Sequence, residues 1–164
     1  MRTCRGGVRR LRMVAAFASL VFAGGCAGLP RDQDGWTDRV RAAGELPVGV
    51  SHEGGAAMAG LEEREKRLVE QVARRLGVRV AWRQGNAHEL LQDLEERTLP
   101  LVAATITADS PFGKTVGLSQ PYLSNGPRKK DYCLAVAPGE NRLLLLIDKV
   151  IAQDRRREEK EGRP

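Results

Sequence analysis

The sequence predicts an α/β domain, a mostly parallel β-sheet flanked by helices. The first observation is an alternation of strand-length apolar runs with segments whose apolar residues recur at helical spacing. The second is that 164 residues, 41% of them hydrophobic, can bury one core but are too few for two full lobes. Together they predict one globular domain over residues 46–152.

Local signals define the individual elements. Gly77 follows a helical pattern at the position where a C-cap glycine belongs. Asn86 precedes another helix, and Glu89 three residues later completes a capping box. The predicted strands are residues 46–50, 78–82, 99–104 and 132–137, with a short extended piece at 116–118. The predicted helices are residues 61–76, the segment after Asn86, and residues 140–153.

Two features of the C-terminal part stand out. Leu143 begins a run of five apolar residues, which is wider than the inner face of one helix. We therefore expect Leu144 or Leu145 to be exposed unless another element covers it. Two interpretations are open: the exposed leucine is part of a surface that binds a partner, or the helix is buried between the sheet and the N-terminal segment. Residues 153–164 carry no apolar side chain after Gln153, so we predict a charged, flexible tail.

The N-terminal segment is typical of an export signal. Residues 1–12 hold five arginines, and an eleven-residue apolar run ends at Ala23. As a helix this run rises about 16 Å, too little to span a bilayer comfortably. Residues 1–25 are therefore predicted to be a signal peptide. The sequence Ala-Gly-Gly-Cys resembles a lipobox, which implies lipid attachment at Cys26; a plain signal peptide is the alternative.

An exported lipoprotein would lie in the periplasm or cell envelope, anchored to the membrane by its lipid. Residues 26–45 are then predicted to be a membrane tether with a short amphipathic piece at 36–43. The five arginines belong to the signal, so of 27 basic side chains 22 remain against 21 acidic ones. This near-neutral balance argues against a nucleic-acid partner.

Catalytic and metal-binding patterns are not found in the sequence. Neither His-x-x-x-His nor Cys-x-x-Cys occurs, and no serine stands in a strand-to-helix elbow. We therefore expect no enzyme activity, no metal and no cofactor. Cys133 lies in an apolar strand pattern and is expected to be an inert core thiol.

In a sheet of this type, ligands bind beyond the carboxyl ends of the parallel strands. The side chains there, together with one aromatic residue near the domain edge, are the candidate ligand contacts. They are His52, Trp82, Thr105, Thr107 and Tyr122. Three of them have an ordinary alternative: an exposed loop histidine for His52, a turn-stabilising threonine for Thr107 and a core or domain-edge tyrosine for Tyr122. Nearby Asp109 is expected to organise its own turn through backbone hydrogen bonds.

Residues 87–122 read A-H-E-L-L-Q-D-L-E-E-R-T-L-P-L-V-A-A-T-I-T-A-D-S-P-F-G-K-T-V-G-L-S-Q-P-Y. Without a gap, they resemble W-x-E-L-I-P-A-L-x-S-G-K-V-D-L-I-I-A-G-M-T-I-T-P-E-R-A-K-V-V-D-F-S-K-P-Y. This is a pattern of bacterial extracellular solute-binding proteins family 3, which serve polar amino-acid ABC transporters. The resemblance extends over residues 46–152 and implies the periplasmic-binding-protein type II fold.

The departures from that pattern are specific. The family builds a second lobe after the Pro-Tyr corner, but here only residues 123–131 precede the returning strand, about 30 Å when extended. A single-lobe variant is therefore implied. Thr107 matches a ligand-contacting threonine and Thr105 stands where the family has glycine. Phe112 replaces the arginine that clamps the ligand carboxylate, and Ala87 replaces an aromatic ligand contact.

Two functions remain open at this point. By resemblance, the chain is an exported lipoprotein that binds a small, amino-acid-like solute for an ABC permease. The alternative is a degenerate lobe that acts as a protein-interaction module in the cell envelope, which the changes at Phe112 and Ala87 favour.

Overall fold

The computed structural model describes residues 31–51, 59–125 and 130–162. The predicted signal peptide (1–25), the predicted lipid-bearing Cys26 and the predicted ligand contact His52 lie outside the described residues. Within the described residues, no helix is long and apolar enough to cross a membrane.

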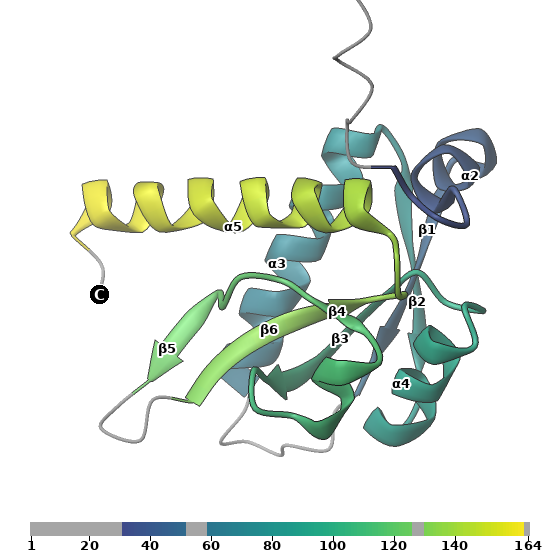
Figure 1. Cartoon of the computed structure of the whole chain (residues 1–164). Helices are drawn as coiled ribbons and strands as arrows, with labels where there is room; N and C mark the ends of the chain where they lie inside the picture. The colour runs from purple at the N-terminus through teal and green to yellow at the C-terminus, as the bar shows by residue number, and fades with distance from the viewer. Residues whose placement is uncertain (1–30, 52–58, 126–129, 163–164) are drawn as a thin grey trace, which may run out of the picture.

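The strands form one mixed sheet with the order β2-β1-β3-β6-β4, and β5 pairs with β6 (Figure 1). The strands are β1 (Glu45–Val50), β2 (Arg79–Gln84), β3 (Leu101–Thr107), β4 (Gly117–Leu118), β5 (Leu123–Asn125) and β6 (Lys130–Val136). Strand β1 is parallel to β2 and β3, whereas β6 is antiparallel to all its neighbours. The α/β class is confirmed, and the parallel arrangement is confined to β2-β1-β3.

Helices cover both faces of this sheet. They are α2 (Trp36–Ala43), α3 (Ala59–Leu76), α4 (Ala87–Glu95), α5 (Asn141–Glu161) and the short 3-10 helix η2 (Pro111–Lys114). Helix α3 lies behind the sheet in Figure 1 and α4 in front of it. A Cβ atom on Gly49 of β1 would stand 2.8 Å from both Leu90 and Leu99. Glycine at this position therefore permits the close approach of α4 to the sheet.

The capping signals in the sequence form as expected. Asn86 Oδ1 accepts a hydrogen bond of 2.8 Å from the backbone N–H of Glu89 at the start of α4. Gly77 follows α3 with a φ of 75°, a conformation that glycine adopts without strain. A side-chain cap at Asn86 and the backbone freedom of Gly77 thus set these two helix boundaries.

Two buried or half-buried carboxylates join the N-terminal segment to helix α5. Asp32 Oδ1 accepts hydrogen bonds from the backbone N–H groups of Arg142 (2.7 Å) and Leu143 (3.1 Å). Glu140 in turn accepts from the N–H groups of Asp34 (2.7 Å) and Trp36 (3.0 Å) at the start of α2. Each segment therefore satisfies the free N–H groups of the other's helix.

The described part of the predicted tether, residues 31–45, consequently packs on the domain. Trp36 and Val40 of α2 are buried in the common core, and β1 already begins at Glu45. The amphipathic piece expected at 36–43 is helix α2.

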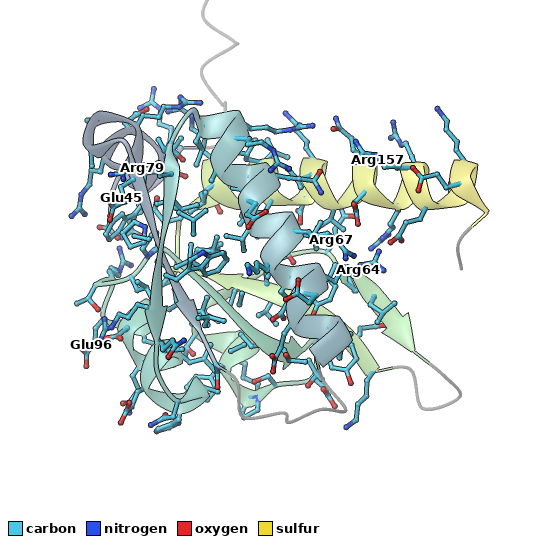
Figure 2. The ribbon with its side chains drawn as sticks, turned by 180° about the vertical axis from the view of Figure 1, so that it is seen from behind. Glu45, Arg64, Arg67, Arg79, Glu96 and Arg157 are labelled. Carbon is cyan, nitrogen blue, oxygen red and sulfur yellow. The ribbon has the colours of Figure 1, made fainter. Side chains whose placement is uncertain are left out.

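The sequence predicts that residues 153–164 form a charged, flexible tail. In the structure, helix α5 instead continues through this segment to Glu161. Arg64 of α3, labelled in Figure 2, holds the second half of α5. The Arg64 guanidinium lies 3.5 Å from Asp154 and 2.5 Å from Glu158. Arg155 also donates a hydrogen bond to the carbonyl of Pro121. A charged sequence thus remains helical because its partners lie on another helix.

The chain turns back directly after the Pro-Tyr corner. Residues 123–125 form β5, which pairs antiparallel with the start of β6, with Leu123 opposite Tyr132. No second lobe is therefore inserted between β5 and β6, as the short connection of residues 123–131 in the sequence predicts.

Helix α5 buries one apolar stripe and leaves one leucine in solvent. Leu143, Ile147, Val150 and Ile151 are buried, whereas Leu145 is 39% exposed. The expectation that the five-residue apolar run is too wide for one helix face is confirmed.

The carboxylate of Asp32 can be tested by Asp32→Ala. Loss of its hydrogen bonds at the start of α5 should lower the free energy of unfolding by about 1–2 kcal/mol, measured by urea denaturation. The control is Asp38→Ala, because the side chain of Asp38 is 71% exposed and pairs with Arg142 at the surface. Its effect should stay below about 1 kcal/mol; equal effects would contradict the capping role of Asp32.

Candidate functional site

Two depressions lie at the carboxyl ends of the parallel strands, the edge where the fold class predicts a site. One lies under α3, and the other lies beside α4 and η2. They share strand β3, whose residues Ala103 and Thr105 line the first and the second depression, respectively.

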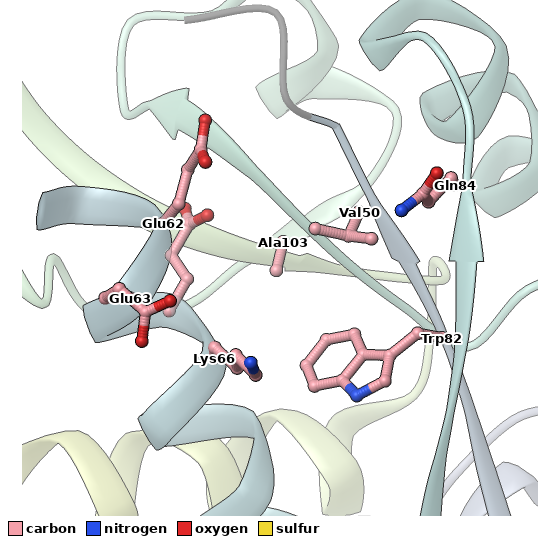
Figure 3. Close-up of a pocket in the computed structure, with 8 residues that line it drawn as sticks. Val50, Glu62, Glu63, Lys66, Trp82, Gln84 and Ala103 are labelled. Atoms are coloured by element: carbon pink, nitrogen blue, oxygen red, sulfur yellow. The ribbon is translucent and has the colours of Figure 1, made fainter. Parts of the chain in front are cut away.

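The first depression, here called the acidic cavity, has a volume of ≈270 Å³. Figure 3 shows Glu62, Glu63 and Lys66 of α3 on one side and Trp82 of β2 on the other. Glu65 and Gln84 complete its polar lining. Trp82 is 38% exposed, so its ring is available as one wall of the cavity.

The register of the parallel strands assembles the inner wall of this cavity. Val50 pairs with Gln84 on one side and with Ala103 on the other. Because partners in register point to the same face of a sheet, their side chains lie in one row under α3. Small Ala103 leaves the space that the cavity occupies.

Glu65 is the most unusual residue of the acidic cavity, because it is a carboxylate that is only 1% exposed. Its Oε1 accepts hydrogen bonds from the Tyr122 hydroxyl (2.7 Å) and the Thr105 N–H (2.8 Å). Its Oε2 is also buried and has no hydrogen-bond partner. Burial raises the pKa of Glu65 from its ordinary 4.5 to about 7, although these hydrogen bonds oppose the rise.

Tyr122, which donates the hydrogen bond to Glu65, is part of the hydrophobic core. It is 2% exposed, and burial raises the pKa of its phenol above the ordinary value, an effect that the charge of Glu65 reinforces. The hydroxyl remains a proton donor to the carboxylate. Its position fits the alternative of a core tyrosine.

Thr105 has a φ of 52°, which a β-branched residue rarely adopts. The pairing of β3 with β6 shifts register between Val102 and Ile106, and Thr105 lies within this irregularity. This conformation accompanies the hydrogen bond from the Thr105 N–H to Glu65. The glycine that the family pattern has here would adopt the same φ without strain.

The second depression, here called the threonine groove, is wider, with a volume of ≈580 Å³. Its lining includes Ala87, His88, Thr105, Thr107, Asp109 and Phe112. The rings of His88 and Phe112 meet edge to face, with centroids 5.5 Å apart. The aromatic ring thus lies in the groove at the position where the family pattern has arginine.

Thr107 and Asp109 interact at this groove. A hydrogen bond from the Thr107 side chain is the main factor that holds the pKa of the Asp109 carboxyl below its ordinary value. Asp109 is an exposed carboxylate, and none of the described residues that line the groove is an arginine or a lysine. The groove therefore offers hydroxyl groups, an imidazole and apolar surface, but no guanidinium to bind a ligand carboxylate.

The structure divides the five predicted ligand contacts. It brings Thr105 and Thr107 together in the threonine groove, and Trp82 into the acidic cavity. Tyr122 lies in the core against Glu65, and His52 lies outside the described residues. Direct contact of any of these residues with a ligand remains a prediction.

Sequence reasoning missed Glu65. A signal was present, because Glu65 lies four residues after Leu61 and three before Leu68 on the apolar face of α3. A carboxylate at such a position is either buried against the sheet with the neighbouring leucines or breaks the apolar face of the helix. Its partners Thr105 and Tyr122 are 40 and 57 residues away, so no local pattern identifies them.

The remaining chemistry is modest within the described residues. Cys133 is buried, and burial raises the pKa of its thiol to about 11, so it is a core thiol in the neutral form. Over residues 31–51, 59–125 and 130–162, no group of three or more His, Cys, Asp or Glu side chains could hold a metal ion.

Comparisons with known proteins agree on the fold. No family model and no curated protein matches the chain. Among solved structures, the arginine-bound form of domain 1 from TmArgBP has a TM-score of 0.61 at 24% identity, over 71% of this chain and 98% of that chain. A mutant of ArgBP from T. maritima has a TM-score of 0.63 at 15% identity, over 77% and 96%.

A third structure, an ancestral cationic amino acid solute binding protein (AncCDT-1), has a TM-score of 0.60 at 12% identity, over 77% and 96% of the two chains. These structures and the sheet topology define the class of fold. The chain has the fold of a single domain of the periplasmic binding protein type.

The raised pKa of Glu65 predicts a specific pH dependence of stability. The folded state binds the proton more tightly than the unfolded state, so stability is fully present below about pH 4.5 and is lost as the pH rises through about 7. The free energy of unfolding should fall by up to about 3 kcal/mol over this range, because one pKa unit corresponds to about 1.4 kcal/mol.

Glu65→Gln should remove this contribution, so that the variant gains stability relative to the parent chain between about pH 5 and 8. Denaturation curves at several pH values measure the difference, and Glu63→Gln, on the exposed side of α3, is the matched control. Parallel pH profiles for the parent chain and Glu65→Gln would refute the assignment.

Proposed function

We propose that this chain binds a small, polar, amino-acid-like solute at the carboxyl edge of its sheet, as a binding protein without catalytic activity. The observation that carries the proposal is the threonine groove, which lies where the fold class places ligands. Domain 1 of TmArgBP, a single domain of similar fold, is described as arginine-bound. This supports the view that one such domain can bind a solute without a second lobe.

The proposal includes the cellular setting that the first 26 residues indicate. The chain is exported, lipid-anchored through Cys26 in the periplasm or cell envelope, and delivers its solute to an ABC-type permease. The arginine-rich segment, the apolar run and the lipobox-like sequence support these points.

The groove also constrains the solute. With Phe112 at the family's arginine position and Asp109 at the groove, the described lining offers no guanidinium to the carboxylate of a ligand. The hydroxyls of Thr105 and Thr107 and the Asp109 carboxylate can instead accept hydrogen bonds from donor groups of a ligand. An open groove on one domain buries less of the ligand than a closed cleft does, so modest affinity is expected.

Ligand binding can be detected by thermal unfolding of the full chain against amino acids, amines, organic acids and small sugars. A ligand at about 100 times its Kd adds roughly 2.7 kcal/mol to stability. Thr107→Ala should reduce the resulting increase in Tm, because it removes one hydroxyl from the groove. Thr98→Ala is the control, since Thr98 is exposed and bonded to Asp93 outside the groove; equal increases in both variants would exclude the groove.

A second candidate function is a protein-interaction module, and the exposed Leu145 favours it. This leucine lies on α5 beside partly buried Leu144 and Leu146. Single exposed apolar residues are common, so the case depends on a measured association.

Leu145→Glu should abolish a complex or oligomer of the full chain if α5 forms its interface, because a buried charge without a partner is strongly unfavourable. Light scattering of the parent chain and the variant measures this. Gln153→Glu, an exposed substitution on the same helix that also adds one negative charge, controls for the change in charge. An unchanged mass distribution in Leu145→Glu would count against the module.

A further inference from the structure

We propose that the acidic cavity under α3 binds an organic cation, a primary ammonium or guanidinium group on a short apolar chain. The cavity lies on the other face of the sheet from α4, and its polar lining does not include Thr107. The inference therefore goes beyond the proposed function and does not require the threonine groove to hold a ligand.

The first argument is the unsatisfied oxygen of Glu65. Oε1 is fully used by Tyr122 and Thr105, but Oε2 is buried with no hydrogen-bond partner. A buried acceptor without a partner has lost its hydration and gained nothing in return. An N–H donor that enters the cavity beside Glu65 and reaches Oε2 would restore the missing bond, and a charged donor would also compensate the carboxylate.

The second argument is the balance of charge. Among the described residues, the carboxyl groups of Glu62, Glu63 and Glu65 line the cavity, with Lys66 as the one basic side chain. Glu62 and Glu63 stand with Lys66 on the α3 side of the cavity (Figure 3). An excess of negative charge around a partly enclosed space attracts cations and disfavours anions.

The third argument is Trp82 on the opposite wall. It stands on β2, the edge strand of the sheet, and 38% of it remains exposed. A half-exposed indole ring facing a group of carboxylates suits a cation, because the ring attracts positive charge while it packs against an apolar chain. Val50 and Ala103 supply further apolar surface between the two walls.

The shape of the cavity favours an organic cation over a metal ion. The carboxylates are spread along one wall, and no group of three His, Cys, Asp or Glu side chains in the described residues could hold a metal ion. A volume of ≈270 Å³ fits a ligand of several heavy atoms and is at the small end of ligand pockets.

The test uses the full chain at about pH 8, where Glu65 is largely ionised because its pKa is about 7. The probes are butylammonium and butylguanidinium chloride, and neutral 1-butanol serves as their control. The chain has two tryptophans, so proton–nitrogen NMR reports two indole N–H signals, which Trp82→Phe assigns. Both cations should shift the Trp82 signal in a saturable manner, whereas the signal of buried Trp36 should not move.

Two variants identify the residues that bind the cation. Glu65→Gln keeps an oxygen for Tyr122 and Thr105 but removes the charge, and should weaken binding by about tenfold or more. Trp82→Ala, followed by calorimetry, should weaken it several-fold. Glu96→Gln is the matched control, because Glu96 is an exposed residue beyond the end of α4 and should leave the affinity unchanged.

Three outcomes would overturn the proposal: no saturable shift with either cation, equal binding of 1-butanol, or unchanged affinity in both Glu65→Gln and Trp82→Ala. Thr107→Ala should bind the cations as the parent chain does. A loss of cation binding in Thr107→Ala but not in Glu65→Gln would assign the cation to the threonine groove, and thus also overturn the proposal while leaving the proposed function intact.

Discussion

The buried carboxylate of Glu65 joins the three parts of the molecule that meet at the carboxyl edge of the sheet. It connects helix α3 to the Thr105 backbone of β3 and to Tyr122 at the chain's return. Its burial is unfavourable for a charged group, which raises its pKa to about 7. The bonds of Oε1 offset part of this cost, whereas Oε2 is left without a hydrogen-bond partner; the residue itself lines the acidic cavity. The same side chain therefore holds α3, β3 and Tyr122 together and contributes a carboxyl group to the lining of the acidic cavity.

Because no second lobe is inserted between β5 and β6, the carboxyl edge of the sheet remains uncovered by a second domain. In a two-lobe protein a ligand is enclosed from both sides, but here the strand ends form two separate depressions on opposite faces of β3. The threonine groove keeps Thr107, which matches a threonine of the family pattern, but has Phe112 in place of the pattern's arginine. The acidic cavity depends on Glu65 and Trp82, which lie outside the residues aligned with that pattern. The two depressions therefore differ in their lining: hydroxyls and one carboxylate in the groove, and three carboxyl groups and an indole ring in the cavity.

Part of the candidate site could be predicted from the sequence. The rule that ligands bind beyond parallel strands indicates this edge, and Thr105, Thr107 and Trp82 do line depressions there. That a ligand binds at this edge stays a prediction. Tyr122 and Glu65 could not be assigned in this way. Whether a tyrosine faces a ligand or a buried acid depends on a partner 57 residues away, and sequence spacing within one element carries no information about such pairs.

The sequence by itself determined the elements whose causes are local: the Asn86 cap, the end of α3 at Gly77, the apolar strands and the short return after Tyr122. Only the tertiary structure decided the features that depend on distant partners. Helix α5 extends to Glu161 because Arg64 binds Asp154 and Glu158. Asp32 and Glu140 bond each other's helix starts across more than a hundred residues. Backbone propensity and apolar spacing act over a few residues, whereas ion pairs and buried hydrogen bonds form only between groups that folding has brought together.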